Sequence, residues 1–269
     1  MVYYQKTVNA NIPGKARRQI LKITKKLKRL FENPVRVENL QTYYRLSDCG
    51  YDKVKPPYID NETCLRNFIS QFGQKNFHLI ADNVNDSTWE RINELYPSIT
   101  SSRTTFGNGA ASFNMALDLA LEQTACEGVY FVEDDYLHQP GSYEILIEGL
   151  ELGADYITLY DHPDKYFDGG NPLIEGDGEI TKVYLTKSCH WKLTNSTTMT
   201  FAATVKTLRK NESVLRKWTS STHPHDFDLF MELRDMGSSL ISPIPGYATH
   251  GETKWLCPIV NWEALAKEE

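Results

Sequence analysis

The sequence lacks any apolar run long enough to cross a membrane. No stretch approaches the length of about 20 apolar residues that a transmembrane helix requires. The first six residues, MVYYQK, show none of the apolar character of a secretory signal. We therefore expect a cytoplasmic protein, in contact with a membrane at most from its surface.

The sequence also lacks paired cysteines. Five cysteines are scattered over 269 residues, and no two of them form a Cys-x-x-Cys pair. This pattern argues against a zinc knuckle or a disulfide framework and favours buried, reduced thiols. Hydrophobic residues at 41% and charged residues at 24% are typical of a globular chain without low-complexity tracts. The length favours one large α/β domain over two small ones.

Positive charge is scarce except at the N-terminus. The net charge is −6, but residues 1–36 hold ten Lys or Arg residues and only one acid. Within this segment, the apolar residues of 15–31 recur near the helical period, which predicts a basic amphipathic helix. Such a helix either packs on the domain or contacts anionic lipid at a membrane surface. Because the rest of the chain is acidic, we expect no nucleic-acid partner.

Strand and helix patterns alternate along the first part of the chain, and this alternation predicts a mainly parallel sheet covered by helices on both faces. Beyond residue 160 the pattern changes to a Gly- and Pro-rich mobile loop over 161–180, short antiparallel strands and a helix over 226–235. The predicted fold is therefore α/β, with a smaller antiparallel region. The predicted strands of the first part are 37–46, 76–81, 129–132 and 156–160, and its predicted helices are 61–72, 87–95, 109–121 and 143–152.

Three adjacent carboxylates follow one of the buried strands. Glu133, Asp134 and Asp135 come directly after the apolar run 128–132, and ligands of parallel sheets bind at the carboxyl ends of strands. Like charges in such a cluster repel one another unless a cation or a proton neutralises them. Mg²⁺ and Mn²⁺ accept oxygen ligands and keep open positions for phosphate. Strand alternation would point Glu133 and Asp135 to one side and Asp134 to the other. The alternative is an acidic turn that caps the next helix.

Three motifs, in this order, resemble the nucleotide-sugar glycosyltransferases of the GT-A fold. They are Asp82 after the second strand, the helix start Gly107-Asn108-Gly109, and the run FVEDDY at 131–136. The acidic triplet lies where that superfamily carries its Asp-x-Asp motif, and the resemblance covers about residues 37–250. Many relatives have an Arg-Asn pair in the helix after the glycines, whereas this chain has Phe113-Asn114.

The resemblance implies a single catalytic domain over residues 37–269, with a nucleotide-sugar half at 37–160 and an acceptor half at 161–269. In it, Asp135 would bind the Mn²⁺ or Mg²⁺ that bridges the diphosphate, while Glu133 and Asp134 would contact ribose, sugar or metal-bound water. Further contacts to the nucleotide-sugar are implied at the strand exits, by Arg45, Ser47, Asp82 and Asn83.

Two further motifs complete the implied site. His250 is implied as a second metal ligand, and an imidazole favours Mn²⁺ over Mg²⁺; the alternative is a structural histidine. The run at 225–229 resembles the Glu-Asp-x-Asp-Leu motif of inverting members, with His225 in place of Glu. By this match Asp226 is the general base that deprotonates the acceptor hydroxyl. Acids in a first helical turn are also favoured for purely structural reasons. The predicted acceptor-binding residues are Asp228 and Trp191; Trp191 and Trp255 either stack on a sugar or pack in the core.

These features predict a metal-dependent glycosyltransferase that moves a sugar from a nucleotide-diphospho-sugar to the hydroxyl of a glycan or other acceptor, with inversion. A retaining reaction needs no general base and stays an alternative. A nucleotidyltransferase would carry a Gly-rich basic loop after the first strand, where this chain reads RLSDCG from residue 45. A metal-dependent nuclease is disfavoured because the basic residues lie far in sequence from the acids. A non-catalytic sugar- or membrane-binding module is the remaining alternative.

Overall fold

The computed structural model describes residues 36–50, 53–176 and 178–267. They belong to one compact unit, Val35–Glu269. The amphipathic helix predicted over residues 15–31 lies outside the described residues. Within the described ranges, every helix is too short or too polar to cross a membrane. All five cysteines are free, and all except Cys49 are buried.

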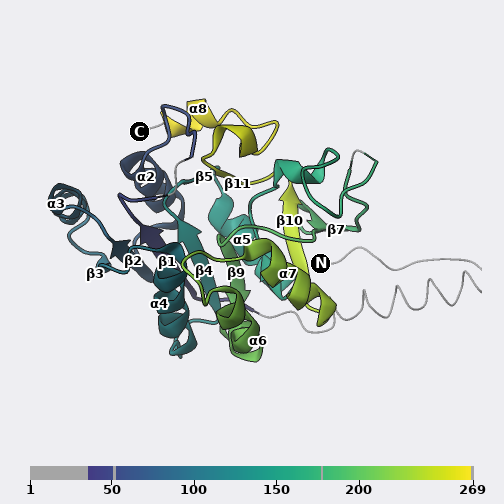
Figure 1. The fold of residues 1–269 in the computed structure, drawn as a ribbon, viewed down its shortest axis with the longest axis horizontal. Helices are drawn as coiled ribbons and strands as arrows, with labels where there is room; N and C mark the ends of the chain where they lie inside the picture. The colour runs from purple at the N-terminus through teal and green to yellow at the C-terminus, as the bar shows by residue number, and fades with distance from the viewer. Residues whose placement is uncertain (1–35, 51–52, 177, 268–269) are drawn as a thin grey trace, which may run out of the picture. The chain divides into compact units, whose positions relative to one another are not determined.

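The main sheet has nine strands in the order β3-β2-β1-β4-β9-β6-β10-β8-β7 (Figure 1). Its first four strands are parallel, as the alternation of strands and helices predicts. Because they are parallel, their carboxyl ends share one edge of the sheet. These strands are β1 (Leu40–Leu46), β2 (Phe77–Asp82), β3 (Thr100–Thr104) and β4 (Gly128–Glu133).

The other strands of this sheet are mixed in direction. β9 runs antiparallel to β4 and β6, β10 runs parallel to β6, and β8 runs antiparallel to both β10 and β7. The predicted α/β class, with a smaller antiparallel region, is therefore confirmed. The bounds are β6 (Tyr156–Ile157), β7 (Val183–Leu185), β8 (His190–Leu193), β9 (Phe201–Thr204) and β10 (Leu240–Ile244).

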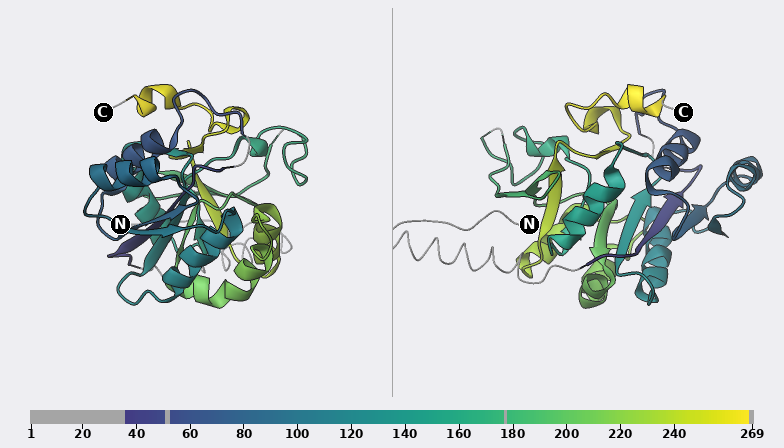
Figure 2. Two further views of the ribbon diagram at one scale, coloured as in Figure 1. Left: turned by 60° about the vertical axis from the view of Figure 1, so that its left-hand side comes forward. Right: turned by 180° about the vertical axis from the view of Figure 1, so that it is seen from behind.

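Helices cover both faces of the sheet (Figures 1 and 2). On β1, Tyr43 joins the core beneath α4, α6 and α7, whereas the next residue, Tyr44, packs against Phe68 of α2 on the opposite face. This alternation explains why neighbouring residues of one strand are both fully buried. The helices are α2 (Asn61–Phe72), α3 (Asp86–Leu95), α4 (Gly109–Leu121), α5 (Ser142–Glu151), α6 (Val205–Trp218), α7 (Asp226–Asp235) and α8 (Trp262–Ala266).

A second, two-stranded sheet joins distant parts of the sequence. β5 (Tyr136–His138) pairs antiparallel with β11 (Ala248–His250), and Tyr136 lies opposite His250. Gly251 allows this close approach, because a Cβ at that position would lie 2.7 Å from the backbone oxygen of Asp135. The pairing therefore brings His250 beside the acidic triplet that precedes β5.

Buried polar contacts hold both ends of the loop predicted over residues 161–180. It contains the short helix η1 (Pro163–Lys165), and the ammonium group of Lys165 lies 3.1 Å from Asp164 and 2.9 Å from the hydroxyl of Ser196. Near its end, Glu179 accepts a hydrogen bond from the backbone N–H of Asn195. These contacts anchor the two ends of the segment, and the predicted mobility of the residues between them stays a prediction.

Candidate active site

The exits of three parallel strands meet at one edge of the sheet. In the register of β1 and β4, Arg45 lies beside Glu133, and in that of β1 and β2, Leu46 lies beside Ala81. The polar residues that follow these strands are therefore neighbours in space, although up to 88 positions separate them in sequence.

Glu133 is paired with a buried arginine. Arg45 is 6% exposed, and its guanidinium lies 3.2 Å from the Glu133 carboxylate. It also donates a hydrogen bond to the backbone oxygen of Gly109 and lies over the ring of Phe113. Thr200 contacts Glu133 at both its backbone N–H and its carboxylate. Arg45 thus ties β1 and β4 to the start of α4, and its predicted contact with a nucleotide stays a prediction.

Asp134 turns toward the exit of β1. Its carboxylate accepts a hydrogen bond of 2.6 Å from the backbone N–H of Ser47. Burial and the neighbouring charge of Asp135 raise the pKa of Asp134 to about 7, although the Ser47 N–H acts in the opposite direction. A proton on Asp134 near neutral pH reduces the repulsion within the triplet.

Asp135 is the most deeply buried of the three acids, at 3% exposure. Its Oδ2 atom lies 2.8 Å from Nζ of Lys53 and 3.3 Å from Nε2 of His250. Burial opposes ionisation, but His250 and Lys53 more than offset it and hold the pKa of Asp135 well below its usual range. The other oxygen, Oδ1, is buried and has no hydrogen-bond partner among the described residues. An ionised carboxylate with one open oxygen is suited to bind a further cation.

Asp135 and His250 fit a metal ion that is shared with a substrate. They offer a carboxylate oxygen and an imidazole nitrogen, both acceptable to Mn²⁺. No group of three or more His, Cys, Asp or Glu side chains in the described ranges could hold a metal by itself. Two protein ligands completed by water and phosphate oxygens are typical of metals that bind diphosphates.

Asp226 is the first residue of α7, and its carboxylate accepts a hydrogen bond of 2.7 Å from the backbone N–H of Phe227. Burial, and to a smaller extent the charge of Glu133, raise its pKa to about 6, although the Phe227 N–H and His250 act in the opposite direction. The electrostatic influence of Glu133 and His250 is consistent with a place near the acidic triplet. Asp228, two residues further along the first turn, is exposed.

Asp82, the last residue of β2, makes hydrogen bonds within the fold. Asp82 is 4% exposed and accepts hydrogen bonds from the Thr104 hydroxyl and from the backbone N–H groups of Phe106 and Gly107. It thereby shapes the loop that leads into α4. Asn83 is exposed at the turn after β2, with a positive φ of 55°. The predicted binding of the nucleotide-sugar by both residues stays a prediction.

Trp191 does not lie where a sugar could stack on it. Its side chain is fully buried, its indole N–H donates to the hydroxyl of Thr186, and its ring lies against Gly149. The predicted acceptor contact is corrected on this ground, because both faces of the ring are covered by the core. Trp255 is only half buried, and its ring lies 6.2 Å from that of Phe167 in a stacked arrangement.

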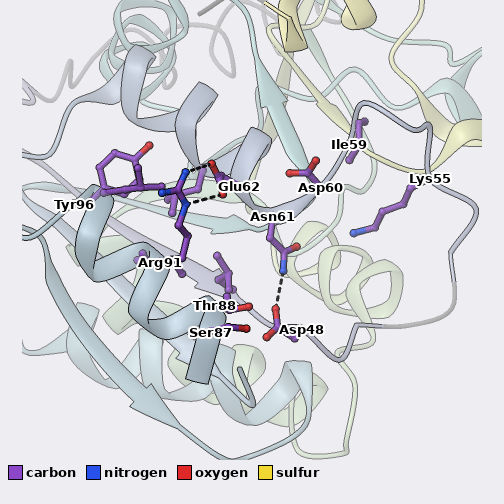
Figure 3. Close-up of a pocket in the computed structure, with 14 residues that line it drawn as sticks. Asp48, Lys55, Ile59, Asp60, Asn61, Glu62, Ser87, Thr88, Arg91 and Tyr96 are labelled. Atoms are coloured by element: carbon purple, nitrogen blue, oxygen red, sulfur yellow. Dashed lines mark hydrogen bonds and ion pairs between the residues drawn. The ribbon is translucent and has the colours of Figure 1, made fainter. Parts of the chain in front are cut away.

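A hollow of about 740 Å³ lies between α2 and α3 (Figure 3). Asp48 is at one end, where its carboxylate accepts hydrogen bonds from the side chain of Asn61 and the backbone N–H of Asn85. Lys55 also lines the hollow, and its ammonium group lies 3.9 Å from the Asp135 carboxylate. The hollow therefore adjoins the acidic centre. Its apolar lining includes Leu46, Ile59, Leu65, Ile92 and Leu95.

Lys53 and Lys55 were not predicted from the sequence to belong to the site. The sequence feature that could have indicated them is the presence of two basic residues shortly after the first strand, in a chain whose acids cluster after another strand of the same sheet. The sequence alone did not show that this loop folds back over Asp135.

Comparisons with known proteins agree with this architecture. No protein-family model matches the sequence, and no curated protein matches it either. Among solved structures, GalNAc-T7 with UDP, GalNAc and Mn²⁺ matches 83% of this chain at a TM-score of 0.54 and 11% identity. The match covers 46% of GalNAc-T7, so the chain spans about half the length of that protein.

Two weaker structural matches were also found. TarS from S. aureus (residues 1–349) has a TM-score of 0.40 and 15% identity, over 65% of this chain and 49% of that one. A nucleotidyl transferase from Methanothermobacter has a TM-score of 0.41 and 11% identity, over 76% and 86%. At these identities the comparisons bear on the fold alone. The fold of this chain is GT-A-like.

Proposed function

We propose that this protein is a metal-dependent glycosyltransferase that moves a sugar from a nucleotide-diphospho-sugar to an acceptor hydroxyl, with inversion at the anomeric carbon. The observation that carries the proposal is the buried, ionised Asp135, whose Oδ2 lies beside His250 and whose Oδ1 has no hydrogen-bond partner among the described residues, at the carboxyl edge of a GT-A-like sheet. Lys53 and His250 offset the cost of burying this carboxylate, so the support comes from the unpartnered oxygen beside an imidazole nitrogen.

Asp135 and His250 would hold the metal ion of this reaction. When bound, a divalent ion neutralises the charge that develops on the leaving diphosphate. Asp134, whose pKa is about 7, is only about half ionised at neutral pH, which reduces the negative charge near the phosphates. Arg45 offsets the charge of Glu133 at 3.2 Å, which further limits repulsion of the donor.

Asp226 would act as the general base. The pKa of about 6 leaves it mostly ionised at pH 7 and still basic enough to accept a proton from the acceptor hydroxyl. Deprotonation of that hydroxyl as it attacks the anomeric carbon gives inversion by direct displacement. The half-buried Trp255 replaces Trp191 as the tryptophan available to an acceptor sugar.

The nucleoside would lie in the hollow between α2 and α3. The volume of about 740 Å³ is in the range of small-molecule sites, and Lys55 links it to Asp135. Asp48 would accept hydrogen bonds from the base or ribose. Asp48→Asn should then weaken the binding of nucleoside diphosphate but leave the binding of inorganic pyrophosphate unchanged.

Thermal-shift screening of nucleotides and nucleotide-sugars, with and without Mn²⁺, tests the proposal. A ligand that binds only the folded state raises the unfolding temperature, so we expect a shift from one nucleotide-sugar that depends on Mn²⁺. That donor should then be turned over in the presence of an acceptor. Manganese-dependent binding without turnover of any donor would favour a non-catalytic binding module instead.

A further inference from the structure

Lys53 lies across the two candidate metal ligands. Its Nζ atom is 2.8 Å from Oδ2 of Asp135 and 3.0 Å from Nε2 of His250. The side chain of Lys53 is 23% exposed, whereas those of Asp135 and His250 are 4% and 9% exposed. The ammonium group of Lys53 therefore lies between the buried Asp135–His250 pair and the solvent.

Lys53 contacts Nε2 of His250, the ring nitrogen that faces Asp135, and Oδ2 of Asp135, and leaves only Oδ1 of the pair without a partner among the described residues. An ammonium group only donates hydrogen bonds, so when the imidazole is neutral with its proton on Nδ1, Nε2 of His250 accepts one through its ring lone pair. Coordination to a metal would require this lone pair and a carboxylate oxygen of Asp135. A divalent ion and the Lys53 ammonium cannot both occupy this position.

Lys55 provides a contrast within the same loop. Its Nζ atom is 3.9 Å from the same oxygen of Asp135, beyond hydrogen-bond distance, and its side chain is similarly exposed at 29%. The two lysines thus carry equal charge near one carboxylate, but only Lys53 bridges the pair.

We propose that Lys53 is a tethered cation that occupies the Asp135–His250 pair before the donor binds, and that a divalent metal must displace it. This inference rests on the proposed function, because it assumes that the pair is a metal site. Lys53 is therefore a residue that sets metal affinity. Its long, unbranched side chain, held on a loop and partly exposed, can swing toward solvent without moving either ligand.

The test is a calorimetric titration of the whole protein with Mn²⁺ alone, for the wild type, Lys53→Met and Lys55→Met. Methionine keeps an unbranched side chain but removes the charge and the hydrogen bonds. Loss of hydrogen bonds between charged groups should tighten Mn²⁺ binding about tenfold or more in Lys53→Met. The same loss of charge at Lys55 should tighten it less than about threefold, as expected for a more distant exposed charge. Circular dichroism would show that both variants fold.

Three other results of the Mn²⁺ titration would contradict the inference. Mn²⁺ binding to the wild type that is unchanged or weaker in Lys53→Met would overturn the inference but leave the proposed metal site intact. Equal tightening in both variants would also overturn it, since charge rather than position would then be responsible. If neither the wild type nor Lys53→Met bound Mn²⁺, the inference and the proposed metal dependence would fall together.

Discussion

Asp161 and Asp135 are both buried carboxylates, 2% and 3% exposed, on one chain, but their surroundings differ. Oδ1 of Asp161 lies 2.8 Å from the buried ammonium of Lys192, and Oδ2 accepts a hydrogen bond from the Tyr166 hydroxyl. Nearby, Asp164 is paired with Lys165 in the same way. The Oδ1 atoms of all three aspartates lack a hydrogen bond among the described residues, but in Asp161 and Asp164 this oxygen lies within ion-pair distance of a lysine. In Asp135, by contrast, both ion pairs made by lysines run to Oδ2.

This difference separates charge that supports the fold from charge that is available to a ligand. The buried pairs of Asp161 and Asp164 fix the segment after residue 160, and each aspartate has one oxygen beside a buried lysine. The lysines of the Asp135 site are partly exposed and both contact Oδ2, whereas Oδ1 has no partner among the described residues. Substitutions in the first group should therefore reduce stability, and substitutions in the second should reduce binding and catalysis.

The largest expected effect is that of Asp135→Asn. The change keeps the shape of the side chain but removes the charge that would bind the metal, so metal-dependent transfer should fall by more than about 100-fold. Release of nucleoside diphosphate from the donor, with Mn²⁺ present, measures it. Near-normal activity in a folded Asp135→Asn protein would refute the site.

Asp226→Asn should reduce kcat by about 10²- to 10⁴-fold, the usual contribution of a general base. Because the base must be ionised and its pKa is raised to about 6, kcat/KM of the wild type should rise with pH through about 6. The variant should lose this inflection. Asp235→Asn, at the exposed acid that ends α7, is the matched control. An unaltered pH profile in Asp226→Asn would assign the base to another group.

Lys192→Met tests whether the buried ion pair with Asp161 stabilises the fold. It leaves Asp161 buried without its cation, which should lower the free energy of unfolding by about 3–5 kcal/mol. Denaturant unfolding measures the loss. Lys267→Met, which breaks an exposed pair with Glu263, should cost less than about 1 kcal/mol. Similar losses in both variants would mean that the buried pairs do not hold this segment.

Gly251→Ala should give the smallest effect. An added Cβ would meet the backbone oxygen of Asp135 and the side chain of Ile59, and relieving this clash would shift the neighbouring His250. Mn²⁺ affinity should fall about tenfold, as for other displaced metal-site partners. Gly178→Ala, where an added Cβ meets nothing within 4 Å, should leave the affinity unchanged. An equal affinity in both variants would show that β11 does not set the geometry of the site.

The first half of the fold was readable because its signals are local. The strand Gly128–Glu133 is built on an apolar run, Leu40–Leu46 is rich in β-forming residues, and polar residues follow both strands. Their parallel pairing then placed Arg45 beside Glu133. By contrast, the helix Val205–Trp218 was missed, although Thr204 caps it, because most of its residues are polar.

The candidate site was only partly readable because long-range contacts build it. Pairing between β5 and β11, each only three residues long, brings His250 to Asp135 across 115 positions, and such short strands have little periodicity. The position of Lys53 depends on how a loop returns over the sheet edge, and the burial of Trp191 depends on its fit against Gly149. The type and spacing of the residues were therefore enough to predict the acidic residues of the site, whereas their contact partners could be identified only from the structure.

The most direct test of the account is a calorimetric titration of the wild type and of Asp135→Asn with a panel of nucleoside diphosphates, with and without Mn²⁺. We expect at least one nucleoside diphosphate to bind the wild type far more tightly when Mn²⁺ is present. In Asp135→Asn, Mn²⁺ should no longer increase the affinity for that nucleoside diphosphate. If neither manganese nor any nucleoside diphosphate binds the folded wild type, the assignment of this centre to nucleotide-sugar transfer is contradicted.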